Sequence, residues 1–173
     1  MEKFRPDIYQ KSIYEIDYLK LKNMGIRCLL FDLDNTIAPL EMEVPDKKLK
    51  DFFMYIEELG LKPIIMSNAS KKRVTPFKEK CNVDSCYHSN KPFSKKYDKI
   101  LNTFHFKDTE IACIGDQLLT DIYGANIHGF TSILVNPISK KDPFKTKINR
   151  FFERKIYYFL KKKGLLEQGV YYE

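Results

Sequence analysis

Short apolar runs alternate along the chain with segments whose apolar residues recur at helical spacing. The apolar runs cover residues 28–31, 64–66, 111–114 and 133–135, with a weaker candidate at 85–88. Helical spacing of three or four positions covers residues 49–59, 97–104 and 118–127. Strands that alternate with helices predict right-handed βαβ units, and therefore an α/β fold with a doubly wound, Rossmann-like parallel sheet.

The run at 28–31 leads directly into two carboxylates one residue apart, Asp32 and Asp34. Alternate residues of an extended chain point to the same side, so both carboxylates can meet one ligand. In open α/β sheets the ligand site lies beyond the carboxyl ends of the strands. Because two like charges held together require a cation or a proton between them, the pattern predicts a metal-assisted site.

Polar residues also follow the other predicted strands. Ser67 and Asn68 follow the run at 64–66, and Lys91 lies further along the chain. Asp116 follows the run at 111–114, and Asp121 comes five residues later. Taken singly, each has an ordinary explanation: Ser67 can end a strand, Lys91 can be a surface lysine, and Asp121 can be a first-turn acidic residue of a helix. Four polar clusters at successive strand ends favour one shared site instead.

In this order the four clusters resemble the motifs of the haloacid dehalogenase (HAD) superfamily, over roughly residues 25–137. The resemblance implies phosphoryl transfer, which needs a nucleophile, charge neutralisation and a proton for the leaving group. It implies that Asp32 is the nucleophile, forming an aspartyl-phosphate, and that Asp34 is the general acid and then the base. An Asp at this second position is typical of HAD phosphatases, so the implied enzyme is a phosphomonoester hydrolase.

The resemblance also implies the phosphate and metal ligands. Ser67 and the backbone N–H of Asn68 would bind phosphoryl oxygens, and Lys91 would offset the negative charge of the nucleophile and the transferring group. Mg²⁺ is the implied cofactor, since it prefers carboxylate and carbonyl oxygens together with substrate oxygens. Its implied ligands are Asp32, the backbone carbonyl of Asp34, Asp116 and Asp121.

The chain has little room for the cap domain that many HAD enzymes of small metabolites carry. Residues 35–66 and 68–90 each leave space for about one helix with its loops. A HAD fold without a cap has an open site, and capless members often act on macromolecules or other large substrates. We therefore expect the substrate or a partner to exclude water from this site.

The segments that flank the motifs narrow the resemblance. Residues 4–7, 35–39 and 115–126 are similar to the YqeG-like branch of the capless IIIA-type HAD phosphatases. That branch is related to phosphatidylglycerophosphate phosphatases, which implies dephosphorylation of this lipid in phospholipid biosynthesis. Two alternatives stay open: the same chemistry on a soluble, protein or nucleic-acid phosphate, and a non-catalytic binding protein with a HAD fold.

Composition suits one globular domain: the chain has 173 residues, of which 43% are hydrophobic and 31% charged. We expect an N-terminal segment packed on the core (1–26), a catalytic core (27–137) and a basic tail (138–173). The tail carries ten Lys or Arg and four Asp or Glu, whereas residues 1–137 carry twenty and nineteen. Most of the net charge of +7 therefore lies in the tail, which indicates an anionic partner.

Within this tail, residues 144–163 have the pattern of a basic amphipathic helix. We expect one face to carry its apolar residues, which are Phe144, Ile148, Phe151, Phe152, Ile156, Phe159 and Leu160. Such a helix can lie in a membrane interface, where each basic residue contributes about 1 kcal/mol on an anionic surface. Alternatively, the apolar face docks on the domain. A basic tail also suits nucleic acid, although the sequence contains no recognised nucleic-acid-binding motif.

No apolar stretch reaches the roughly 18 residues that a spanning helix needs, and the first residues lack the apolar region of a secretory signal. We therefore expect a cytoplasmic protein with peripheral contact at the inner membrane face.

Cys28 and Cys113 fall in predicted buried strands, where cysteine behaves as a small hydrophobe. Cys81 and Cys86 lack the two further ligands of a zinc site, and their role stays open.

Overall fold

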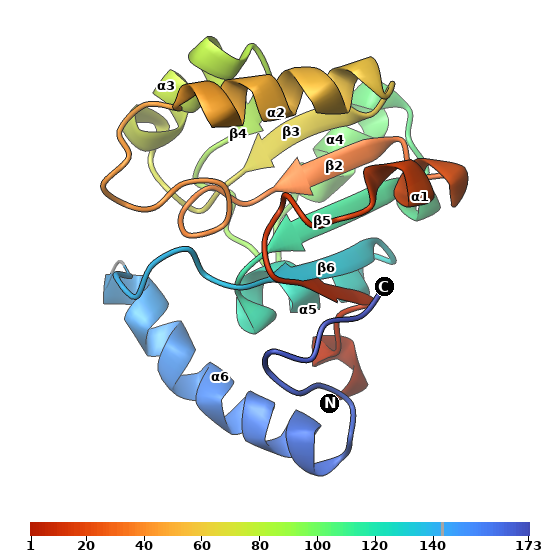
Figure 1. Ribbon diagram of the computed structural model, residues 1–173, viewed down its shortest axis with the longest axis vertical. Coiled ribbons are helices and arrows are strands. Elements are labelled where there is room, and N and C mark those ends of the chain that lie inside the picture. The colour runs from red at the N-terminus through yellow and green to blue at the C-terminus, as the bar shows by residue number, and fades with distance from the viewer. Residues whose placement is uncertain (143) are drawn as a thin grey trace.

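A six-stranded sheet, in which every neighbouring pair of strands is parallel, forms the centre of the molecule (Figure 1). The structure is a computed structural model that describes residues 1–142 and 144–173. The strands are Ile8–Gln10 (β1), Cys28–Phe31 (β2), Lys62–Met66 (β3), Asp84–Cys86 (β4), Ile111–Gly115 (β5) and Thr131–Val135 (β6). Their order, β1-β6-β5-β2-β3-β4, confirms the predicted doubly wound α/β fold and puts β2 between β5 and β3.

Helices cover both faces of this sheet. They are Tyr18–Asn23 (α1), Lys47–Glu58 (α2), Lys71–Cys81 (α3), Lys96–Phe104 (α4), Tyr123–Ile127 (α5) and Phe144–Lys162 (α6). The first three pack on one face of the central strands, and α4 and α5 pack on the other. Successive strand residues alternate between these two cores, so that Leu29 and Phe31 face α2 while Cys28 and Leu30 face α4. A strand buried on both faces explains the continuous apolar run at 28–31.

The predicted helix at 118–127 begins differently from the expectation. Residues Leu118–Ile122 form a wide π-helical turn before α5. The backbone N–H groups of Asp121 and Ile122 both donate to the carbonyl oxygen of Gln117, at 3.1 and 3.2 Å. π-helical turns are frequent at functional sites, and this one carries Asp121 into the interior, where the side chain is buried.

Strand β1 has no counterpart among the predicted strands. It pairs with β6 at the edge of the sheet, with Ile8 opposite Ile133. Tyr9 in β1 also forms an antiparallel bridge with Tyr172, so both ends of the chain meet at this edge (Figure 1). Three residues are too few to show an alternating pattern, and only the pairing with β6 makes the segment a strand.

The single apolar face expected for the C-terminal helix is wrong. In α6 Leu160 is buried and Ile156 is partly buried, whereas Ile148, Phe151, Phe152 and Phe159 are exposed. The side chain of Phe144 lies outside the described residues. The apolar residues are therefore divided between two sides of the helix: one side docks on the domain and the other faces solvent. Over the described residues, no helix combines the length and apolarity needed to cross a membrane.

Leu160 and Phe159 provide a matched test of this orientation. Leu160 is 0% exposed and packs with residues such as Tyr9 and Leu134, whereas the neighbouring Phe159 is 50% exposed. We expect Leu160→Ala to lower the free energy of unfolding by about 2–5 kcal/mol because it leaves a cavity. Phe159→Ala should change it by about 0.5 kcal/mol or less. Urea titrations followed by circular dichroism measure both, and equal losses would show that α6 docks differently.

Candidate active site

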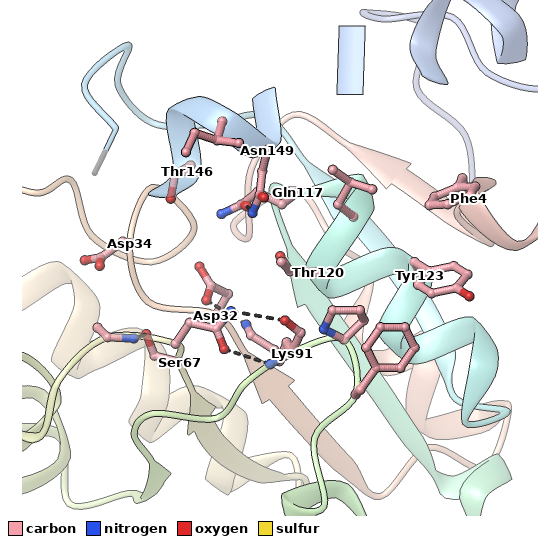
Figure 2. Close-up of a pocket in the computed structure, with 16 residues that line it drawn as sticks. Phe4, Asp32, Asp34, Ser67, Lys91, Gln117, Thr120, Tyr123, Thr146 and Asn149 are labelled. Carbon is pink, nitrogen blue, oxygen red and sulfur yellow. Dashed lines mark hydrogen bonds and ion pairs between the residues drawn. The ribbon is translucent and has the colours of Figure 1, made fainter. Parts of the chain in front are cut away.

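The polar residues singled out in the sequence converge at the carboxyl edge of the sheet. Asp32 directly follows β2, Ser67 follows β3, Lys91 lies in the loop after β4, and Asp116 follows β5. A pocket of about 840 Å³ opens at this edge (Figure 2). Of the predicted site residues, Asp32, Asp34, Ser67, Asn68 and Lys91 line it.

Three carboxylates form a buried acidic cluster at this edge: Asp32, Asp116 and Asp121. They contribute oxygen atoms that all lie within 4.8 Å of one another. Burial raises the pKa of Asp32, and the neighbouring charge of Asp121 raises it further. Burial likewise raises the pKa of Asp116. Carboxylates packed this closely away from water need positive charge nearby if they are to stay ionised.

Lys91 supplies one of these positive charges. Its Nζ lies 2.7 Å from Oδ1 of Asp32 (Figure 2). The same Nζ lies 2.6 Å from Oδ1 of Asp121, and the Lys91 side chain is buried. Burial alone would lower the pKa of Lys91, but the two carboxylates outweigh burial and raise it. The side chain of Asn68 fixes the backbone here, because its Oδ1 accepts the N–H of Lys91 at 2.8 Å.

Arg150 supplies a second positive charge, and the sequence reasoning missed it. This residue reaches the cluster from α6: its guanidinium pairs with the Asp116 carboxylate and donates to the Asp116 carbonyl oxygen at 2.8 Å. The guanidinium also donates to the carboxylate of buried Glu153 at 3.0 Å. The Glu153 carboxylate in turn accepts the N–H of Leu119 at 3.0 Å. Glu153 is the sole acidic residue of 144–163 and follows Arg150 by three positions, so the two side chains share one side of a helix. This pairing is the sequence feature from which Arg150 could have been singled out.

The loop after β2 ties this strand to the tail. Thr36 bridges the cluster, because its hydroxyl lies 3.4 Å from Oδ2 of Asp32 and 3.3 Å from Oδ1 of Asp116. Asn35, in a left-handed conformation with φ of 66°, donates to the carbonyl oxygen of Lys141 at 2.8 Å and to Asp142 at 3.0 Å. These contacts hold the start of the tail against the site.

Asp34 lies apart from the acidic cluster. It lies on the wall of the pocket (Figure 2). Among the described residues its carboxylate pairs with Nε of Arg73 at 2.9 Å. Arg73 comes from α3 and also donates to the carbonyl oxygens of Pro39, at 3.1 Å, and Met42. Arg73 therefore anchors both Asp34 and the loop that follows it, a role that the sequence reasoning did not find.

Gly115, at the end of β5, gives Asp121 access to the cluster. A Cβ at this position would collide with the carboxylate of Asp121. The N–H of Gln117 donates to Oδ2 of the same carboxylate at 3.2 Å, which leaves Oδ1 to Lys91. Only glycine allows this close approach between strand and side chain.

The pocket above the cluster has two chemically distinct parts. Its floor carries the polar side chains of Asp32, Ser67 and Lys91. Its wall includes apolar and aromatic residues from separate parts of the chain: Phe4, Pro92, Phe93, Leu119, Tyr123 and Ile148. Gln117, Thr120, Thr146 and Asn149 also line the pocket, so it can receive a ligand that has an ionic end and an apolar part.

The donor set suits a divalent cation. Carboxylate oxygens are the ligands that hard cations such as Mg²⁺ prefer, and Asp32, Asp116 and Asp121 converge closely enough to share one ion. Each carboxylate has two oxygens, so Asp116 can hold Arg150 with Oδ2 and still present Oδ1 to an ion. The cluster can thus bind a divalent metal without losing its contact to the tail.

The fold is shared with solved HAD structures. A Legionella pneumophila structure assigned to the HAD superfamily, subfamily III A, aligns with a TM-score of 0.52 at 18% identity. The alignment covers 73% of this chain and 74% of that chain. This likeness shows the class of fold, and in this chain the acidic, lysine-containing site lies at the carboxyl edge of that fold's sheet.

Sequence relatives identify the family. The profile described as "Mitochondrial PGP phosphatase" matches residues 1–139. The chain is 35% identical over 164 residues to "Probable phosphatase YqeG" of Bacillus subtilis (strain 168), covering 95% of each. It is 24% identical over 158 residues to "Phosphatidylglycerophosphate phosphatase 1, chloroplastic" of Chlamydomonas reinhardtii, covering 86% of this chain and 59% of that protein. The chain therefore belongs to the PGP phosphatase family.

The ion pair between Arg150 and Asp116 gives a testable consequence for stability. Arg150→Gln leaves Asp116 without its cation, and we expect metal-free protein to lose about 3 kcal/mol of unfolding free energy. This value is at the low end for a broken buried ion pair, because the Arg150 side chain is 21% exposed. Added Mg²⁺ should stabilise the variant more than the wild type, since it supplies the missing charge.

Urea unfolding with EDTA and with Mg²⁺ measures both effects. Arg154→Gln is the matched control, because Arg154 is exposed on the same helix. If Arg150→Gln and Arg154→Gln were equally stable in EDTA, Arg150 would not be neutralising the acidic cluster.

Proposed function

We propose that this protein is a Mg²⁺-dependent phosphatase that removes the terminal phosphate of phosphatidylglycerophosphate in phospholipid biosynthesis. The observation that carries the proposal is the pocket, whose floor carries Asp32, Ser67 and Lys91 and whose wall includes the aromatic side chains of Phe4, Phe93 and Tyr123. This combination suits an amphiphilic phosphate ester better than a fully polar one. Membership of the PGP phosphatase family supports the same substrate.

In the proposed reaction Asp32 is the nucleophile. A carboxylate oxygen of Asp32 forms a bond to phosphorus while the bond between phosphorus and the ester oxygen breaks, leaving an aspartyl-phosphate. Lys91, 2.7 Å from Asp32, favours the ionised nucleophile that this step needs. The hydroxyl of Ser67 and the N–H of Asn68 would bind the phosphoryl oxygens.

Asp34 is the proposed general acid and base. It would donate a proton to the departing ester oxygen and then take a proton from the water that attacks the aspartyl-phosphate, releasing phosphate and restoring Asp32. Arg73, 2.9 Å from Asp34, holds this carboxylate on the pocket wall. Mg²⁺, held by Asp32, the backbone carbonyl of Asp34, Asp116 and Asp121, would supply charge neutralisation for the phosphoryl oxygens.

The open pocket makes water exclusion depend on the substrate and its surroundings. One helix, α2, separates the loop of Asp34 from Ser67, and one helix, α3, separates Ser67 from Lys91. The start of α6 contributes Thr146, Ile148 and Asn149 to the pocket. A lipid substrate at the inner face of a membrane would complete this enclosure, which makes peripheral membrane contact part of the proposal.

The proposal is tested by phosphate release from phosphatidylglycerophosphate in mixed micelles and from soluble phosphomonoesters, each with Mg²⁺. We expect the lipid to be preferred and Asp32→Asn to abolish release while the fold is kept, because the nucleophile is lost. Asp98→Asn, an exposed carboxylate on α4, is the control and should retain activity. Activity confined to soluble, protein or nucleic-acid phosphates would keep the chemistry and overturn the lipid substrate.

The acid role of Asp34 predicts a dependence on the leaving group. Asp34→Asn should slow cleavage of an alkyl phosphate by about 10²–10⁴-fold, because an alkoxide needs a proton to depart. The first step with p-nitrophenyl phosphate should be slowed much less, since a nitrophenolate departs unaided. Rapid-quench measurement of the first turnover separates this step from the later hydrolysis of the aspartyl-phosphate. An equal slowing with both esters would contradict the acid role.

A further inference from the structure

The outward side of α6 exposes several large apolar side chains. This outer stripe consists of Ile148, Phe151, Phe152, Tyr158 and Phe159, whose exposed fractions range from 47% to 64%. Their spacing of three, four and seven residues places them along one side of the helix. Large apolar side chains gathered on one exposed side mark a surface for interaction.

Basic residues lie within and beside the outer stripe. Among the described side chains of this region, the exposed Lys and Arg residues are Lys147, Arg154, Lys155, Lys161, Lys162 and Lys163. Lys155 lies within the stripe, with its Nζ 5.6 Å from the centroid of the Phe151 ring. The single acidic residue between 144 and 163, Glu153, is buried on the opposite side against Arg150. The outward side of α6 therefore combines apolar side chains with positive charge, which complements a surface with anionic groups above an apolar layer.

The outer stripe begins at the mouth of the catalytic pocket. Ile148 belongs to the stripe and also lines the pocket. Phe93, which lines the pocket as well, is 72% exposed. Figure 1 shows α6 beginning beside the carboxyl ends of the strands and running along the β6 side of the sheet. A flat surface that covered the stripe would therefore also face the pocket mouth.

We propose that the outer stripe and Phe93 form a docking surface for an anionic lipid bilayer. The inference rests on the proposed lipid substrate and deepens it, because it names the surface that presents the pocket to the membrane. A second copy of this chain fits less well: a symmetric contact through the stripe would bring Lys155 and Lys162 of both copies together. Nucleic acid would use the basic residues but would leave the aliphatic Ile148 without a matching contact.

The experiment is co-sedimentation of the full chain with vesicles of phosphatidylcholine alone or mixed with phosphatidylglycerol. Neither vesicle contains phosphatidylglycerophosphate, so binding is measured independently of turnover. We expect binding to the mixed vesicles that weakens as salt rises, because salt screens the basic residues. The double variant Phe152→Gln/Phe159→Gln should bind the mixed vesicles at least about tenfold more weakly, and Lys155→Glu/Lys162→Glu should also bind them more weakly.

Met54→Gln/Tyr55→Gln is the matched control, because both residues are exposed on α2. This variant should bind like the wild type. All variants should keep the helical circular dichroism signal and the rate on a soluble phosphomonoester, since none of the four substituted stripe and lysine positions lines the pocket. Equal loss in the stripe variant and the control would overturn the assignment of the surface.

Other outcomes separate this inference from the proposed function. Vesicle binding without turnover of phosphatidylglycerophosphate would uphold the docking surface and overturn the lipid substrate. Turnover in mixed micelles without vesicle binding would uphold the substrate and overturn the surface. Self-association in sedimentation velocity that the stripe variant abolishes, or binding of single-stranded RNA in preference to vesicles, would assign the stripe to a different partner and overturn the proposal.

Discussion

The burial of three carboxylates at one edge of the sheet is the constraint on which the rest of the structure depends. Asp32, Asp116 and Asp121 come from different parts of the chain and meet where water is largely excluded. Such a cluster is unfavourable unless positive charge lies among its members. Lys91 meets this need from the loop after β4, and Arg150 meets it from the C-terminal helix.

This need for charge explains why the tail is part of the site. Arg150 pairs with Asp116, and Asn35 holds the backbone of Lys141 beside the loop that follows Asp32. Once Arg150 points inward, the helical repeat turns Phe152 and Phe159 outward. The same helix thus neutralises the acidic cluster on one side and exposes an apolar stripe on the other.

Much of the fold could be predicted because its signals are local. The run at 28–31 is apolar throughout because β2 is covered on both faces. Gly60 marks the end of the next predicted helix, at 49–59. The convergence of Asp32, Ser67 and Asp116 also follows from sequence, since parallel strands bring their carboxyl ends to one edge. Strand β1 could not be predicted in this way, because three residues are too few to show an alternation of apolar and polar positions. Its pairing with β6 also joins distant parts of the chain.

The sequence by itself determined the alternation of strands and helices from β2 to β6 and the residue types gathered at the strand ends, since both follow from short-range patterns. Only the tertiary structure decided that Arg150 joins Lys91 in balancing the acids and which side of the last helix is buried. Arg150 is separated from Asp116 by more than thirty positions, and Arg73 is similarly distant from Asp34. Pairings at such separations depend on how the helices pack on the sheet, and no local pattern encodes that packing.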